Sequence, residues 1–182
     1  MKTPWGKSDS IQELAEGIKL VTTPRHGGVK LDRKRNAKMP EYMRQEGGWY
    51  EEDAKWAFVA LIFPEAFPER AEMALKTVKN WYPDIYEKFT GATVQPGESF
   101  IRDRELFSKA HEHDLIVTAA WSGSPIGKPH VKVPAGKVLV VATPGGARGS
   151  VPEHWFYVPT NEYDARGPHG FVINGTHEAT SI

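Results

Sequence analysis

Apolar residues recur along this chain with two different spacings, and the change between them falls near residue 113. Before that point they mostly return every three or four positions, which is the period of a helix. This spacing predicts helices over residues 10–18, 51–63, 69–82 and 99–111, with a further helical turn over 84–89. Beyond it they form short runs separated by glycine, proline and serine, which predicts strands over residues 115–121, 137–143, 154–158 and 170–174.

One hairpin is expected inside the helical part. Residues 19–23 form an apolar run typical of a strand, and the chain then turns at Pro24 and at the pair Gly27-Gly28. Residues 29–31 would pair back onto the first strand, and a short polar helical turn is expected at residues 33–39.

Helices gathered before strands, without alternation of the two, are typical of an α+β fold. We therefore expect N-terminal and central helices packed on a mainly antiparallel C-terminal sheet. A chain of 182 residues fits a single globular domain spanning residues 1–182, with a helical part at about 8–112 and a strand-rich part at about 113–182. Six tryptophans, six tyrosines and eight phenylalanines supply the large side chains of the core.

The charge balance and the absence of cysteine exclude several classes of protein. Lys and Arg number 23, equal to Asp and Glu, so general nucleic-acid binding and polybasic membrane binding are unexpected. The charge is uneven, however, because residues 1–48 hold ten basic side chains against six acidic ones. With no cysteine, disulfides, thiolate nucleophiles and the usual structural zinc sites are excluded. The longest apolar run, residues 56–63, is far shorter than the roughly 20 residues of a membrane span, so no membrane partner is expected.

The first candidate site is the segment from Thr22 to Gly28. Its two glycines would let the backbone approach a ligand closely, and His26 could serve as a base or as a metal ligand. Arg25, His26, Gly27 and Gly28 are therefore predicted ligand-binding residues. The alternative is a plain hairpin turn with an exposed histidine. No Gly-Lys-Ser/Thr follows, so the segment is not a phosphate-binding loop.

The second candidate is the segment from Gly47 to Asp53, in which Trp49 and Tyr50 are predicted ligand-binding residues. Glu52 or Asp53 could act with His26 around a divalent cation or as a general base. Three successive carboxylates on a helix point about 100° apart, so they cannot all face one ion. The alternative is that they only stabilise the start of a helix through its dipole.

Two other features are weaker. A glycine-rich loop at residues 144–150 carries Arg148, which we count as a predicted ligand-binding residue because such a loop can form an anion-binding nest. A simple connection between strands would look the same. The pair His111 and His113 resembles a metal-binding tract, but residues two apart on a helix face away from each other. We expect no metal site and no cofactor.

Several short motifs follow one another along nearly the whole length of the chain. They are Trp5-Gly6, residues 23–28, Met39-Pro40, residues 48–53, Phe63-Pro64, residues 96–99 and residues 162–164. With these motifs in this order, the chain resembles an uncharacterised family of domains of unknown function from tailed phages and from mobile regions of proteobacteria. The resemblance implies a small protein made in the cytoplasm of a host bacterium, and it supplies no functional residues.

These observations favour an accessory protein that acts by binding a host protein or a small anionic ligand, for instance as an inhibitor of host defence. Abundant tryptophan, tyrosine and arginine are typical of interfaces. The alternative is a divalent-metal-dependent hydrolase that uses His26 with Glu52 or Asp53.

Overall fold

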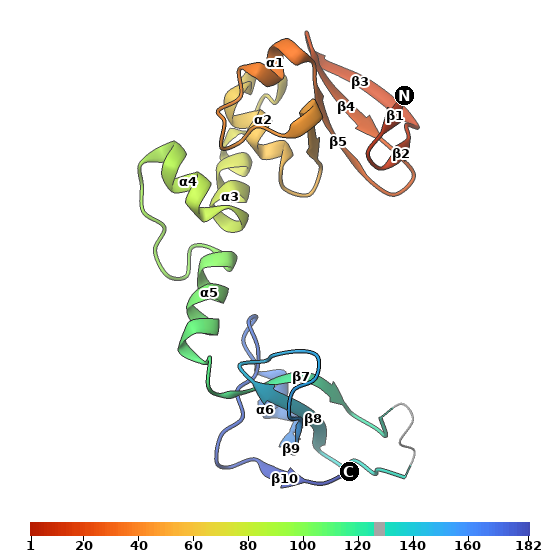
Figure 1. The fold of residues 1–182 in the computed structure, drawn as a ribbon, viewed down its shortest axis with the longest axis vertical. Helices are drawn as coiled ribbons and strands as arrows, with labels where there is room; N and C mark the ends of the chain where they lie inside the picture. Colours follow the sequence, from red (N-terminus) through yellow and green to blue (C-terminus); the bar gives the residue numbers. More distant parts are fainter. Residues whose placement is uncertain (126–129) are drawn as a thin grey trace. The chain divides into compact units, whose positions relative to one another are not determined.

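The computed structural model describes residues 1–125 and 130–182. The chain divides into two compact units, Met1–Arg102 and Asp103–Ile182, which are described separately (Figure 1). Every strand pairing between the named strands is antiparallel, and helices occur in both units. The predicted α+β class with antiparallel sheets is therefore confirmed. That residues 1–182 form one domain stays a prediction.

The first unit contains a four-stranded sheet with the strand order β3-β4-β5-β6, a two-stranded hairpin of β1 and β2, and a group of helices (Figure 1). Its strands are β1 Lys2–Thr3, β2 Gly6–Lys7, β3 Ser10–Ala15, β4 Ile18–Thr22, β5 Gly27–Leu31 and β6 Trp49–Glu51. Its helices are α1 Arg33–Ala37, α2 Trp56–Ile62, α3 Ala71–Trp81 and α4 Pro83–Thr90, with 3-10 turns η1 Glu46–Gly48 and η2 Pro64–Ala66. Helix α5, Phe100–Ala110, contains the boundary between the units.

One face of this sheet forms the core of the first unit with helices α2 and α3. Alternation along β4 and β5 turns Ile18, Val29 and Leu31 to that face, and all three are almost fully buried. Phe58 of α2 and Val78 of α3 pack in the same core. Helix α2 is nearly all apolar and buries four successive residues, which is the pattern of a helix enclosed on most sides.

The second unit is built on a sheet with the order β10-β9-β8-β7. Its strands are β7 Leu115–Trp121, β8 Lys137–Pro144, β9 His154–Pro159 and β10 Glu178–Thr180, and its short helix is α6 Thr160–Asp164. The central strand β8 buries six successive residues, so both of its faces are covered. His177 lies buried beside the sheet, where Nε2 is 2.9 Å from Glu162 Oε1 and Nδ1 accepts the Asn174 N–H at 3.0 Å.

Much of the predicted secondary structure is confirmed. The hairpin of β4 and β5 has the expected strands, and α1 occupies the expected polar turn. Helix α4 follows Pro83 and ends at Gly91, whose φ of 73° is left-handed. Ser99 caps α5 through the Arg102 N–H, which donates to its Oγ at 3.3 Å.

The helix predicted over residues 10–18 is wrong, because those residues form β3 and the start of β4. The two strands pair directly on either side of Glu16 and Gly17, and Gly17 has a φ of 76°. A two-residue turn with a left-handed glycine is a strong hairpin signal that the helical spacing of apolar residues concealed. Ile11, the first of those apolar residues, is 48% exposed on the edge strand.

Two other expectations need correction. The helix predicted over 51–63 begins only at Trp56, because Trp49–Glu51 extends the sheet as β6. No strand forms over 170–174, where the structure has two isolated antiparallel bridges, one from Ile116 to Val172 and one from Gly167 to Gly170. The fourth strand of that sheet is β10, farther along the chain. Within the two described stretches, no helix has the length and apolar character needed to cross a membrane.

Candidate functional site

The two motif segments that the sequence singles out lie side by side in the first unit. Strand β5 begins with Gly27-Gly28, and strand β6 follows Gly48, so the pairing of β5 with β6 sets Gly28 opposite Glu51. One residue farther on, the Glu52 N–H donates to the Gly27 carbonyl at 3.1 Å. The structure thus brings the end of the first segment against the carboxylates of the second.

The turn before β5 is fixed by Thr23. Its N–H and its hydroxyl both donate to the His26 carbonyl, at 2.7 and 2.8 Å, and its Oγ1 accepts the His26 N–H at 3.2 Å. Pro24, Arg25 and His26 are exposed at the tip. The side chains of Arg25 and His26 make no hydrogen bond or ion pair within the part of the chain that is described. The predicted hairpin turn with an exposed histidine is what the structure shows at this point.

The three successive carboxylates have different surroundings. Glu51 accepts the N–H groups of Asp53 and Ala54, so it closes the turn that leads into α2. Glu52 extends over Gly27, where a Cβ would lie 2.5 Å from Glu52 Oε2. Asp53 is exposed. Among residues 1–125 and 130–182, no three His, Asp or Glu side chains are grouped so that they could hold a metal ion.

Below Glu52 the core face of the sheet leaves a hollow of about 180 Å³. Its floor and walls are apolar, and its two charged members are Glu52 and Arg70. The Arg70 guanidinium carbon lies 5.8 Å from the centre of the Trp56 ring, in a cation–π arrangement. We name this the Glu52 hollow; it is lined by Leu20, Gly28, Val29, Glu52, Trp56, Phe67 and Arg70.

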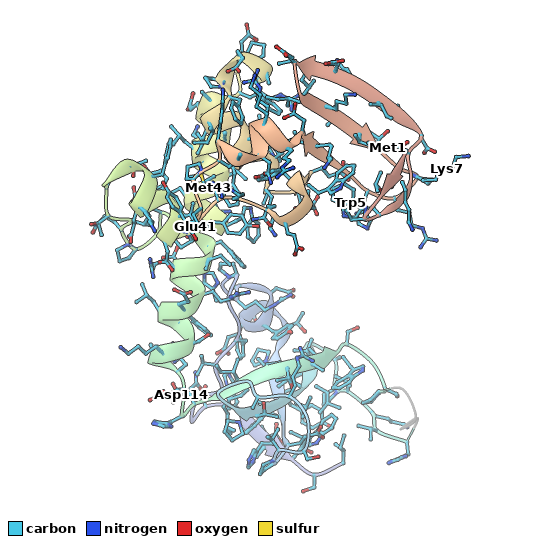
Figure 2. All side chains as sticks on the ribbon, turned by 45° about the horizontal axis from the view of Figure 1, so that its top comes forward. Met1, Trp5, Lys7, Glu41, Met43 and Asp114 are labelled. Carbon is cyan, nitrogen blue, oxygen red and sulfur yellow. The ribbon has the colours of Figure 1, made fainter. Side chains whose placement is uncertain are left out.

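The opposite face of the sheet is occupied by aromatic rings. Trp5 lies at the turn of the β1–β2 hairpin (Figure 2). Its ring packs directly on Gly28. Its ring meets that of Trp49 edge-on, with centroids 5.6 Å apart, and Lys30 Nζ lies 5.1 Å from the centre of the Trp49 ring. Gly28 is therefore required by the close approach of Trp5.

Tyr50 lies in the core. Its hydroxyl donates to Asn36 Oδ1 at 2.7 Å and accepts the Gln45 N–H at 3.2 Å. Burial raises the pKa of this phenol above its ordinary value of 10.0, and the Gln45 hydrogen bond and the Arg44 charge oppose that shift. In this structure Tyr50 connects the sheet to α1 and to the turn before η1.

A basic groove with a volume of about 380 Å³ runs beside these contacts. Three cationic side chains line it: Lys30, Arg33 and Arg44. Lys30 Nζ donates to the Gly47 carbonyl, and Arg44 Nη2 donates to the carbonyls of Met39 at 2.7 Å and of Ala37 at 3.1 Å. The remaining lining residues are Leu31, Asp32, Asn36, Ala37, Gly47 and Gly48.

Arg148 lies in the second unit, beside a different hollow of about 240 Å³. Its Nη2 donates to the Thr118 carbonyl at 3.3 Å. The hollow also contains Trp121 and Trp155, whose rings stack with centroids 5.5 Å apart. The predicted ligand-binding residues thus fall into separate places: the turn, the two faces of the N-terminal sheet, and this second-unit hollow.

Sequence reasoning did not single out Arg44, Trp56 or Arg70. Arg44 belongs to a short polar turn, and Trp56 begins the longest apolar run of the sequence. Arg70 follows Glu69, the one described non-glycine residue with a positive φ, at 67°. No periodicity reports such a feature, because it depends on how α3 joins the preceding turn.

A family model described as a domain of unknown function, DUF7007, matches residues 1–112. No curated protein and no solved structure matches the chain significantly. The matched range contains both motif segments, the Glu52 hollow and the basic groove, whereas Arg148 lies outside it.

Proposed function

Because the chain belongs to the DUF7007 family, a domain of unknown function, we propose a role that rests on the geometry of the matched part: it binds a small anionic ligand in the basic groove. The observation that carries the proposal is the gathering of Lys30, Arg33 and Arg44 around one groove. A volume of about 380 Å³ is within the range of small-molecule sites.

The charges of the groove are arranged for an anion. Its one carboxylate, Asp32, already accepts the Arg35 N–H at 2.7 Å as the cap of α1, so it is held at the helix start. Lys30 and Arg44 are oriented by backbone carbonyls, which leaves less side-chain freedom to lose on binding. Arg33 is exposed and makes no hydrogen bond or ion pair with the described residues.

Arg33 is therefore the side chain with all of its donors available. A guanidinium presents five N–H donors in a planar fork that matches phosphate or carboxylate oxygens. The excess of basic side chains in residues 1–48 adds a long-range attraction for such a ligand. A phosphorylated or carboxylated small molecule is the ligand class that these groups favour.

The proposal is for binding rather than catalysis. The metal-hydrolase alternative needs His26 with Glu52 or Asp53 around one cation, and these side chains do not form a three-ligand group in the described chain. His26 and Asp53 are both exposed, and Glu52 lies over Gly27. The geometry favours the binding role.

The biological setting is part of the proposal. The ordered motifs resemble proteins of phages and mobile elements, and an accessory protein of that kind would act in the host cytoplasm by withdrawing a small anion or by occupying a host protein. Inhibition of host defence is one such action.

The test is calorimetric titration of the purified protein with inorganic pyrophosphate. Binding should be measurable, should weaken as salt is added, and should fall by about tenfold or more in Arg33→Gln, because one charge-assisted contact is lost. Lys34→Gln is the matched control, since Lys34 is the next residue on α1 and does not line the groove.

Equal losses in Arg33→Gln and Lys34→Gln would refute a groove site and leave only general charge attraction. The absence of any binding to pyrophosphate at low salt would refute the anionic ligand itself.

A further inference from the structure

The Glu52 hollow is distinct from the basic groove. The two share no lining residue. The hollow lies on the core face of the sheet, and its apolar side chains are Leu20, Val29, Trp56 and Phe67. The rings of Trp56 and Phe67 are 5.9 Å apart between centroids.

Two opposite charges border this apolar space without meeting. The Glu52 carboxylate makes no hydrogen bond or ion pair within the described chain, and the Arg70 guanidinium has only its contact with the Trp56 ring among the described residues. Because both charged side chains line this one hollow, a single ligand inside it can lie beside each of them. A ligand with a compact apolar body and one charge of each sign complements it.

The backbone beside Arg70 is strained. Glu69 adopts a φ of 67°, a conformation that residues with a side chain rarely take and that costs free energy. The Arg70 N–H donates to the Phe67 carbonyl at 3.1 Å, which closes the turn and sets Arg70 at the first position before α3. The strained turn therefore sets the backbone position from which the Arg70 side chain reaches over the Trp56 ring.

Gly27 leaves room for the other charged group, the Glu52 carboxylate. A Cβ there would lie 2.5 Å from Glu52 Oε2 and 3.2 Å from its carboxyl carbon, so the missing side chain makes the room in which the carboxylate rests. The Glu52 N–H, bonded to the Gly27 carbonyl, fixes the backbone from which that side chain extends.

From these four observations we propose that the Glu52 hollow binds a free apolar amino acid. Its side chain would enter the hollow, its ammonium group would pair with Glu52, and its carboxylate would pair with Arg70. A volume of about 180 Å³ suits one aliphatic or phenyl side chain and is below the usual range for larger organic ligands.

The experiment compares three probes by calorimetric titration of the full chain: L-leucine, L-leucinamide and N-acetyl-L-leucine. Leucinamide keeps the ammonium group without a carboxylate, and N-acetyl-leucine keeps the carboxylate without an ammonium group. Leucine should bind most tightly, by about tenfold over either analogue, since each analogue lacks one charged pairing.

Two variants test which side chain pairs with which charged group of the ligand. Glu52→Gln should weaken leucine binding by about tenfold and leave N-acetyl-leucine unchanged, whereas Arg70→Gln should weaken leucine and leave leucinamide unchanged. Both side chains are exposed, so neither change should prevent folding. Asp53→Asn is the matched control, because it removes the next carboxylate along the chain, which does not line the hollow.

Three results would overturn the proposal. One is the lack of leucine binding at concentrations up to about 10 mM. Another is an equal loss in Glu52→Gln and Asp53→Asn. The third is leucinamide binding as tightly as leucine, which would assign the hollow to the N-terminal residue of a peptide and remove the role of Arg70.

Discussion

Gly28 and Gly27 are adjacent glycines in one strand, and they should respond very differently to substitution by alanine. A Cβ at Gly28 would lie closer than 3.0 Å both to the Trp5 ring and to the backbone carbonyl oxygen of Tyr50. The carbonyl belongs to the paired strand β6, so it cannot retreat without disturbing the sheet. A Cβ at Gly27 would lie 2.5 Å from the carboxylate of Glu52, which is the mobile end of an exposed side chain, and its nearest backbone atom, the Val21 carbonyl oxygen, is farther away at 3.1 Å.

Two opposing effects set the size of the change. Forcing a methyl group into a closely packed place typically costs about 1–3 kcal/mol. Alanine also restricts the unfolded chain, which stabilises the fold by about 0.4–1 kcal/mol. We therefore expect Gly28→Ala to lower the free energy of unfolding by about 1–2 kcal/mol. For Gly27→Ala we expect a change within about 0.5 kcal/mol of zero, since the Glu52 side chain can move aside.

Urea denaturation followed by tryptophan fluorescence measures both changes, provided that the slope of the transition stays the same in each variant. In a Trp5→Ala background, Gly28→Ala should cost less, because one of its two close contacts is gone. Equal stability of the two single variants, or a Gly28→Ala protein as stable as the wild type, would refute the argument that Trp5 and β6 require this glycine.

Three other changes follow from contacts described above. Tyr50→Phe should destabilise the fold by about 1–3 kcal/mol, since the Gln45 N–H loses its acceptor. The raised pKa of Tyr50 means that its contribution is present below about pH 10 and is lost as pH rises through the folded-state value, so wild-type stability should fall more steeply than that of Tyr50→Phe in alkaline urea titrations. Glu69→Gly should raise the melting temperature in calorimetry by relieving the positive φ, and an unchanged or lower value would contradict strain there. Glu162→Ala should lower the stability of the second unit in urea by about 1 kcal/mol, because buried His177 loses its partner; no loss would show that the contact contributes nothing.

Local signals in the sequence predict the elements that begin or end at a proline, a glycine or a helix-capping residue. Pro83, Gly91 and Ser99 each act within one turn of the chain, so the bounds of α4 and the start of α5 follow from them. The hairpin of β4 and β5 also followed, because its turn residues lie between two apolar runs.

The same reasoning fails where pairing with a distant strand determines the secondary structure. Residues 10–15 have a helical spacing of apolar positions, yet they pair with β4 because Gly17 turns the chain back. Trp49 and Tyr50 are predicted ligand-binding residues just before an expected helix, and their pairing with β5 as a strand is not part of that prediction. Pairing between distant segments cannot be read from periodicity alone.

The candidate site likewise has residues that the sequence indicates and residues that only the three-dimensional packing shows. That His26 acts with Glu52 or Asp53 stays a hypothesis from residue types, whereas the pairing of β5 with β6 makes Gly27 and Glu52 direct neighbours. Arg70 and Trp56, by contrast, reach the hollow through the packing of α2 and the strained turn before α3. Their contribution depends on three-dimensional packing that no local pattern encodes.

The Thr23 turn also contains a suitable site for attaching a spectroscopic label. Its ends are fastened to each other by three hydrogen bonds, while the tip residue Arg25 is exposed and has no partner in the described chain. Since the whole sequence lacks cysteine, Arg25→Cys would create a unique thiol for a fluorophore or a spin label. A probe attached there would be close in sequence to Gly27, whose carbonyl accepts the Glu52 N–H. Its spectroscopic signal would therefore suit detection of ligand entry without radioactive tracers.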